Sequence, residues 1–283
     1  MTAAIRAELR RLGRWPAVWV LCGTWLVLNL TFGYVFTYLS YRSTNGTGFG
    51  GGGTREGLLA QMMPDQAPIT LVQGMPMFGG ALLMILGALA VGSGYGWGTW
   101  KTVFTTGPRR TTALGGTFAA VAAVVAGLIV VTLGFDLTAS FVVAAAENQA
   151  AVWPSLLAVA QGLGSAMLIG GMWTAAGLLL GTLARGPALA VGLGLVWALV
   201  VENLLRGVAT LLGPLKVVTD VLPGTAAGSL AGAIGAAPQS DPNGTPGVTT
   251  ILGGTTATAL LVVYLAAFTI VSLGLTARRD IAS

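Results

Sequence analysis

Long apolar runs alternate with polar connections along the whole chain. Six of the runs are long enough for a helix to cross about 30 Å of hydrocarbon. They cover residues 17–39, 75–95, 113–135, 155–184, 188–205 and 251–276. Trp and Tyr residues gather at the two ends of the first run, as is typical where a membrane helix meets lipid headgroups. The pattern predicts an all-α polytopic membrane protein with six transmembrane helices.

The composition agrees with this class. Charged residues make up 8% of the chain and hydrophobic residues 54%, whereas a soluble domain is about 25% charged. The 43 glycines also occur inside the apolar runs, where small side chains let helices approach closely. The absence of His and the single cysteine, Cys22, exclude His-based triads, His metal sites and an internal disulfide.

Residues 1–16 predict a short basic helix with one apolar side. Its arginines are Arg6, Arg10, Arg11 and Arg14. A basic amphipathic helix is expected to lie in the membrane interface, where the arginines anchor it to an anionic leaflet. A cleavable signal peptide is the alternative, but the following apolar run is too long and has no clear A-x-A site.

Six spans place both chain ends on one side of the membrane, and the basic residues indicate which side. Ten of the 14 fall at this side: Arg6, Arg10, Arg11, Arg14, Lys101, Arg109, Arg110, Arg185, Arg278 and Arg279. The other four are Arg42, Arg55, Arg206 and Lys216. The positive-inside rule therefore predicts that both termini, the loop 96–112 and the tail 277–283 are cytoplasmic. The connections 40–74, 136–154 and 207–250 then lie outside.

No motif predicts catalysis by the chain itself. A P-loop needs G-x-x-x-x-G-K-[ST], but Trp100 precedes Lys101 where Gly is required. Gly48, Gly50 and Gly53 fit G-x-G-x-x-G, yet they lie in a low-complexity tract that follows no βαβ strand. We therefore expect no catalytic, cofactor-binding or metal-binding residue. The net charge of +5 is explained by topology, so no nucleic-acid partner is expected either.

Four of the nine acidic residues fall near the predicted outer ends of the spans rather than at their centres. They are Asp136, Glu147, Glu202 and Asp220. Glu202 and Arg206 are spaced i, i+4, so the pattern predicts an ion pair at the outer end of the fifth span. A proton- or sodium-driven carrier is expected to bury carboxylates inside its spans, and the pattern therefore disfavours that class.

The most informative stretch is the basic connection between the second and third spans. Residues 92–118 read GSGYGWGTWKTVFTTGPRRTTALGGTF, with no acidic residue. Trp97, Trp100 and Phe104 have helical spacing. A short helix is expected over 98–106, ending at Gly107-Pro108. Aromatic side chains are favoured at protein interfaces. The basic residues beside them can meet acidic groups on a partner or lipid phosphates.

This loop resembles the first cytoplasmic loop of the ABC-2 type transporter permeases. The resemblance rests on Gly98-Thr99, Lys101-Thr102 and Gly107-Pro108-Arg109-Arg110. In that family a G-T pair, a short helix and a P-x-R-type turn form a coupling helix that docks on the ATPase subunit. The layout of a basic N-terminal helix, six spans, a long loop before the last span and an Arg-Arg-Asp ending is also similar. Gly94 and Thr117 stand where the family often has Glu and Lys.

The resemblance implies the permease subunit of an ATP-driven exporter in the plasma membrane of a bacterium. A separate ABC ATPase chain would bind ATP and Mg, and a second permease chain, identical or similar, would complete a dimeric pathway. The implied docking residues are Trp97, Gly98, Thr99, Trp100, Lys101, Phe104, Pro108, Arg109 and Arg110. A secondary carrier and a non-transporting membrane anchor or assembly subunit are the alternatives, and no residue pattern identifies a substrate.

Overall fold

A computed structural model describes residues 2–43, 47–48, 51–52, 54–106, 110–209, 213–241 and 244–278. Six helical segments of these residues are long and apolar enough to cross a membrane: Pro16–Arg42, Pro64–Gly96, Thr111–Ala146, Leu156–Ala184, Pro187–Ala209 and Gly254–Arg278. The number and order of the predicted spans are confirmed, as expected of a multi-pass helical membrane protein.

Short breaks divide these segments into the labelled elements. The first half of the chain contains α1 (Thr2–Arg14), α2 (Pro16–Leu30), the π-helical η1 (Thr31–Val35), α3 (Phe36–Arg42), the short hairpin β1 (Thr47–Gly48) and β2 (Gly51–Gly52), α4 (Arg55–Gln61), the 3-10 turn η2 (Pro64–Gln66), α5 (Ala67–Gln73), the π-helical η3 (Met75–Gly79), α6 (Gly80–Gly96), α7 (Thr99–Thr106) and α8 (Arg110–Ala146). The second half contains α9 (Leu156–Ala184), α10 (Pro187–Leu195), the π-helical η4 (Val196–Val201), α11 (Glu202–Ala209), α12 (Gly213–Asp220), α13 (Pro223–Ala233) and α14 (Gly254–Arg278).

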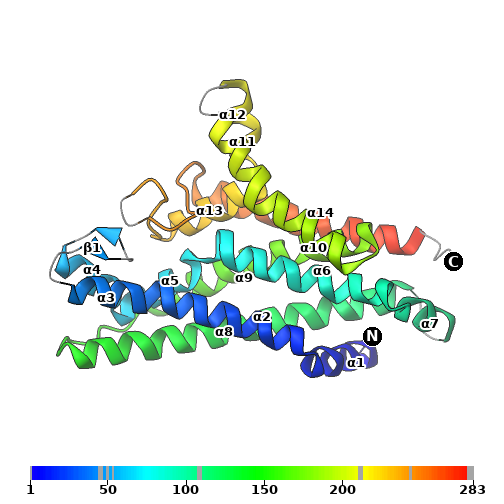
Figure 1. The fold of residues 1–283 in the computed structure, drawn as a ribbon, viewed down its shortest axis with the longest axis horizontal. Coiled ribbons are helices and arrows are strands. Elements are labelled where there is room, and N and C mark those ends of the chain that lie inside the picture. The colour runs from blue at the N-terminus through cyan, green and yellow to red at the C-terminus, as the bar shows by residue number, and fades with distance from the viewer. Residues whose placement is uncertain are drawn as a thin grey trace.

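The long helices lie side by side along the long axis of the molecule (Figure 1). The start of α1, helix α7 and the end of α14 lie at one end, whereas β1 and α4 lie at the other. We call these the α7 end and the β1 end. Helices α11 and α12 project sideways from the bundle, and α13 returns to pack beside α14.

The second and fourth spans form the centre of the bundle. In each of these two spans, 67% of the most apolar 18-residue stretch is buried, against 11% in the span formed by α14. Close packing of α6 on α9 explains this burial, because a Cβ atom at Gly87 would overlap the backbone carbonyl of Thr174, and one at Gly177 that of Met84. Small residues at such crossings let two helix backbones touch. The outer helices then present their apolar side chains to lipid.

Three spans run further toward the β1 end than the sequence pattern predicted. The first span continues to Arg42 and the second begins at Pro64, so much of the predicted outer connection 40–74 is helical. The third continues to Ala146, which corrects the assignment of residues 136–146 to a connection. The pattern ended that span at a charged residue, but Asp136 is buried within the helix and no Gly or Pro follows it there.

Candidate functional site

A tight turn joins α6 to α7 at the α7 end. Trp97 and Gly98 form the turn, and Gly98 has φ +68, a left-handed backbone conformation that Gly adopts without steric cost. Helix α7 then runs over Thr99–Thr106. The short helix expected over 98–106 is therefore confirmed. It is a separate element between two spans.

Trp100 fixes α7 against the end of α6. Its side chain is buried, and its indole Nε1 donates a hydrogen bond to the backbone oxygen of Val91 at 3.0 Å. The ring lies over Gly94, where a Cβ atom would overlap it, and its centroid is 6.1 Å from that of Tyr95. The apolar surface of Trp100 thus packs within the chain, and its predicted contact with a partner stays a prediction. The same packing explains why Gly occupies position 94.

Trp97 is the exposed aromatic residue of this turn. It is 67% exposed, and its ring meets the edge of Trp15 at a centroid distance of 5.8 Å. The guanidinium of Arg11 lies 5.6 Å from the centre of the Trp15 ring. Arg11 also donates a hydrogen bond from Nη2 to the backbone oxygen of Ala90 at 2.9 Å and pairs with Glu8 at 2.8 Å. These contacts join α1, the turn and the end of α6 into one packed unit.

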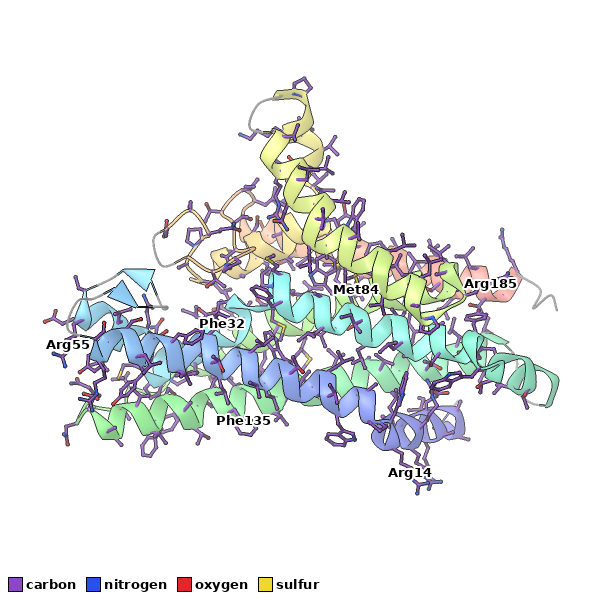
Figure 2. All side chains as sticks on the ribbon, in the orientation of Figure 1. Arg14, Phe32, Arg55, Met84, Phe135 and Arg185 are labelled. Carbon is purple, nitrogen blue, oxygen red and sulfur yellow. The ribbon has the colours of Figure 1, made fainter. Side chains whose placement is uncertain are left out.

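The other arginines of α1 remain available to a surface. Arg6, Arg10 and Arg14 are exposed, while Leu12 is buried against the bundle. Figure 2 shows Arg14 projecting away from the bundle and Arg185 at the α7 end as well. These positions place exposed positive charge at the end where α6 turns into α7.

Seven further predicted docking positions lie in or beside α7. Gly98 and Thr99 are the turn and the first residue of α7. Lys101 and Phe104 lie within α7, and Arg110 is the first residue of α8. Pro108 and Arg109 lie outside the described residues. The arrangement thus brings Trp97 to the surface, directs Trp100 inward and leaves the remaining docking contacts as predictions.

Two carboxylates are buried inside the spans, which corrects the expectation that the spans lack the buried carboxylates of an ion-driven carrier. Asp136 is 0% exposed; its Oδ1 accepts a hydrogen bond from Asn29 Nδ2 at 2.7 Å, and its Oδ2 has no partner among the described residues. The Tyr34 hydroxyl donates to the Asp136 backbone oxygen at 3.0 Å. On a helix that starts at Pro16, Asn29 lies about 20 Å along the axis, within a hydrocarbon layer of about 30 Å.

The second buried carboxylate, Glu202, caps a helix instead of forming the predicted ion pair with Arg206. Glu202 is 1% exposed, and its Oε1 accepts a hydrogen bond from the backbone N–H of Gly224 at 2.7 Å. The Arg206 guanidinium donates to Asn203 Oδ1 at 3.0 Å, and Glu202 and Arg206 do not approach within ion-pair distance. Unpaired N–H groups at the start of α13 attract the carboxylate, because a helix N-terminus carries partial positive charge.

At the β1 end, Glu147 joins α3 to the end of α8. It accepts hydrogen bonds from the hydroxyls of Tyr38 at 2.8 Å and Tyr41 at 2.9 Å, and the Arg42 Nε lies 3.7 Å away. Arg55 of α4 stacks over the Tyr41 ring at 4.8 Å. The tyrosine hydrogen bonds, followed by the attraction of the two arginines, hold the pKa of Glu147 below its usual range.

A cavity of about 530 Å³ opens in the half of the bundle toward the β1 end. Its lining is Trp25, Leu28, Asn29, Phe32, Gly33, Phe36, Thr37, Gln61, Gln66, Ile69, Thr70, Gln73, Gly74, Phe78, Gly235, Ala237, Gly244, Thr245 and Pro246. The sequence pattern missed this site because Gln66, Thr70 and Gln73 fell in the predicted connection 40–74. An available signal was Asn29, an amide in the middle of an apolar run.

Comparison with known proteins adds no identification. No protein-family model matches the sequence, and no curated protein matches it.

Proposed function

We propose that the chain is the transmembrane permease subunit of an ATP-driven ABC transporter, with the α7 end docking on a separate ATPase chain. The observation that carries the proposal is the separate helix α7 between two spans, held by the buried Trp100 with Trp97 exposed beside it. Exposed aromatic residues near basic side chains favour protein interfaces. The resemblance of residues 98–110 to a permease coupling loop supports the same assignment.

The contacts at the α7 end suit the transfer of movement. A partner that displaces α7 would pull on Trp100, whose ring and hydrogen bond join α7 to α6. Because α6 is packed backbone to backbone against α9, the displacement would move the centre of the bundle instead of bending one loop. In this proposal ATP and Mg bind the partner ATPase, and this chain contributes a conformational change. A second permease chain completes the export pathway across the plasma membrane.

Co-purification from the native membrane tests the proposal. The tagged chain is extracted in mild detergent, and its partners are identified and quantified by mass spectrometry. We expect an ATPase with a P-loop in about equal amount, and a loss of at least tenfold with Trp97→Ala. Trp153→Ala is the matched control, because Trp153 is 57% exposed and stacks on one aromatic ring, that of Phe141 at 6.0 Å. Recovery of the chain without an ATPase, under conditions that preserve a reference transporter, would refute the proposal.

A secondary carrier is the second candidate, and the buried Asp136 favours it. Burial of a carboxylate inside a membrane span costs free energy, so a carboxylate found there indicates a function such as ion binding. The test uses the chain alone in vesicles that contain a pH-sensitive dye, with an imposed proton or sodium gradient. Dissipation of the gradient that is lost with Asp136→Asn would support the carrier. An intact gradient, together with recovery of an ATPase, would reject it.

A further inference from the structure

The cavity lies between two irregular helical segments. Its walls are η1 with the ends of α2 and α3 on one side, and α5 with η3 on the other. Gly235, Ala237 and residues 244–246, which follow α13 in the chain, complete the lining. Gly33 allows η1 to approach α5, because a Cβ atom there would lie 2.8 Å from the Thr70 methyl group. π-helical segments within longer helices are frequent at functional sites, and here two of them line one cavity.

Aromatic rings form the apolar part of the lining. Phe32 of η1 and Phe78 of η3 stack with centroids 6.3 Å apart, and Phe36 meets the edge of Phe32 at 5.2 Å. Phe32 is 56% exposed and Phe78 is 40% exposed, so the rings extend from the cavity to the outside of the bundle. Figure 2 shows Phe32 between α2 and α5, in the half toward the β1 end. This side of the cavity therefore opens toward lipid.

Neutral hydrogen-bonding groups form the polar part. The amides are Asn29, Gln61, Gln66 and Gln73, and the hydroxyls are Thr37, Thr70 and Thr245. Among the described residues that line the cavity, none is Asp, Glu, Lys or Arg. Moving an ion out of water into a site without an opposite charge costs several kcal/mol or more. Amides and hydroxyls, in contrast, donate and accept hydrogen bonds with an uncharged ligand. The lining therefore favours an uncharged molecule rich in hydroxyl or amide groups.

Three of these groups, Asn29, Gln66 and Thr70, are already positioned by hydrogen bonds, and Gln73 is among those with bonding capacity to spare. Asn29 is held by Asp136 at 2.7 Å, and Gln66 donates to Asp65 at 2.7 Å. Gln73 makes no hydrogen bond with the described residues, and its Nε2 lies 3.8 Å from where a Cβ atom at Gly33 would stand. An amide that faces a cavity without a partner can supply two donors and an acceptor to a ligand.

The depth of the cavity indicates where its occupant comes from. On a helix that starts at Pro16, Trp25 lies about 14 Å along the axis and Thr37 about 32 Å. The cavity thus reaches from near the middle of a bilayer of about 30 Å to the boundary on the β1 side. An occupant that enters past Phe32 and Phe78 comes sideways from that leaflet.

We propose that this cavity binds an uncharged amphiphile of the β1-side leaflet, with its hydroxyl-rich or amide-rich headgroup against Gln73 and its apolar chain along Phe32 and Phe78. The inference rests on the proposed function in one respect: the amphiphile is cargo of the transporter. Its binding needs only the cavity. The volume of about 530 Å³ lies within the range of about 300–1,000 Å³ for small-molecule sites.

Photolabelling of the full chain in lipid nanodiscs tests the inference. Three probes share a dodecyl chain with a diazirine and differ in the headgroup, which is glucosyl, trimethylammonium or sulfate. Peptide mapping should find that the glucosyl probe labels residues 25–37 and 66–78 at least fivefold more than either charged probe. Equal labelling by all three probes, or labelling spread evenly over α14 and these segments, would overturn the inference.

Variants of Gln73 make the test specific. Gln73→Leu removes the amide at similar size and should lower glucosyl labelling about three- to tenfold, as expected for one or two lost hydrogen bonds. Gln161→Leu is the matched control, because Gln161 is exposed on α9 outside the cavity. Gln73→Glu should shift the preference to the trimethylammonium probe, a gain that misfolding cannot produce. Unchanged preferences in both Gln73 variants would refute the assignment.

The outcomes separate this inference from the proposed function, since labelling needs no ATPase. If an ATPase co-purifies but labelling is unspecific, the cavity assignment fails and the permease assignment stands. If labelling is specific but no ATPase co-purifies, the cavity assignment stands and the amphiphile is not cargo of an ATP-driven transporter.

Discussion

Replacement of Gly177 by Ala should weaken the central helix packing, on which the position of α7 depends. A Cβ atom at Gly177 would overlap the carbonyl oxygen of Met84 and lie 2.8 Å from its carbon and 2.9 Å from the Ala88 nitrogen. All three atoms belong to the backbone of α6, so no side chain can rotate away. The added methyl group can be accommodated only if α6 and α9 separate locally.

The cost follows from the contacts that such a separation weakens. A gap of about 1 Å removes up to half of the attraction between facing atoms, and with about 20 pairs at about 0.15 kcal/mol each the loss is about 1.5 kcal/mol. Overpacking of protein interiors costs about 1–3 kcal/mol in general. Ala also gains up to about 1 kcal/mol over Gly in helix propensity, so a control with the same gain is needed.

Gly164→Ala is that control. Gly164 lies in the same helix, and a Cβ atom there has no neighbour within 4 Å. Unfolding of both variants in mixed micelles, followed by circular dichroism against increasing denaturing detergent, gives the two free energies of unfolding. We expect Gly177→Ala to be less stable than Gly164→Ala by about 1.5–3 kcal/mol. A difference below about 0.5 kcal/mol would refute the direct contact between the α6 and α9 backbones.

Three further predictions concern single polar contacts. The tyrosine donors lower the pKa of Glu147. The carboxylate therefore stabilises the folded chain fully above its unfolded pKa of about 4.3, and this stabilisation is lost as the pH falls through the lower folded pKa. The thermal midpoint of Glu147→Gln should depend less on pH in this acid range than that of the unaltered protein. Trp100→Phe removes the indole donor, should cost about 1 kcal/mol, and should speed amide exchange in α7. Glu202→Leu leaves the Gly224 N–H unpaired, should cost about 1–3 kcal/mol, and should speed exchange in α13, whereas Glu202→Gln keeps an acceptor and should change it less.

The number and order of spans could be predicted from the sequence because each span carries its own signal in one dimension. A run such as 113–135 is apolar on all sides, and its length alone indicates a crossing. The ends of the spans are less predictable, because a polar residue can close a span or be satisfied within it. Asp136 belongs to the second case, and its partner Asn29 is 107 positions away in the chain, beyond any local pattern.

The candidate sites show the same limit. Helical spacing correctly placed a short helix at α7, but it could not show that Trp100 faces inward and Trp97 outward. That difference comes from the left-handed turn at Gly98, which sets the direction of α7 relative to α6. The cavity was beyond prediction for a related reason: its walls come from residues within 25–37, 61–78, 235–237 and 244–246, and only the folded chain brings them together.

One continuous helical segment joins the two sites. η3 contributes Phe78 to the cavity and leads directly into α6, which ends at the Trp97 turn. The 17 residues of α6 span about 25 Å. Because Gly87 lies at its backbone contact with α9, we expect α6 to resist bending there and to move as a rigid body. The irregular hydrogen bonding of η3, which includes Pro76, is where such a segment yields most easily. We therefore expect a displacement of α7 to change the position of Phe78 in η3, and with it the aromatic wall of the cavity.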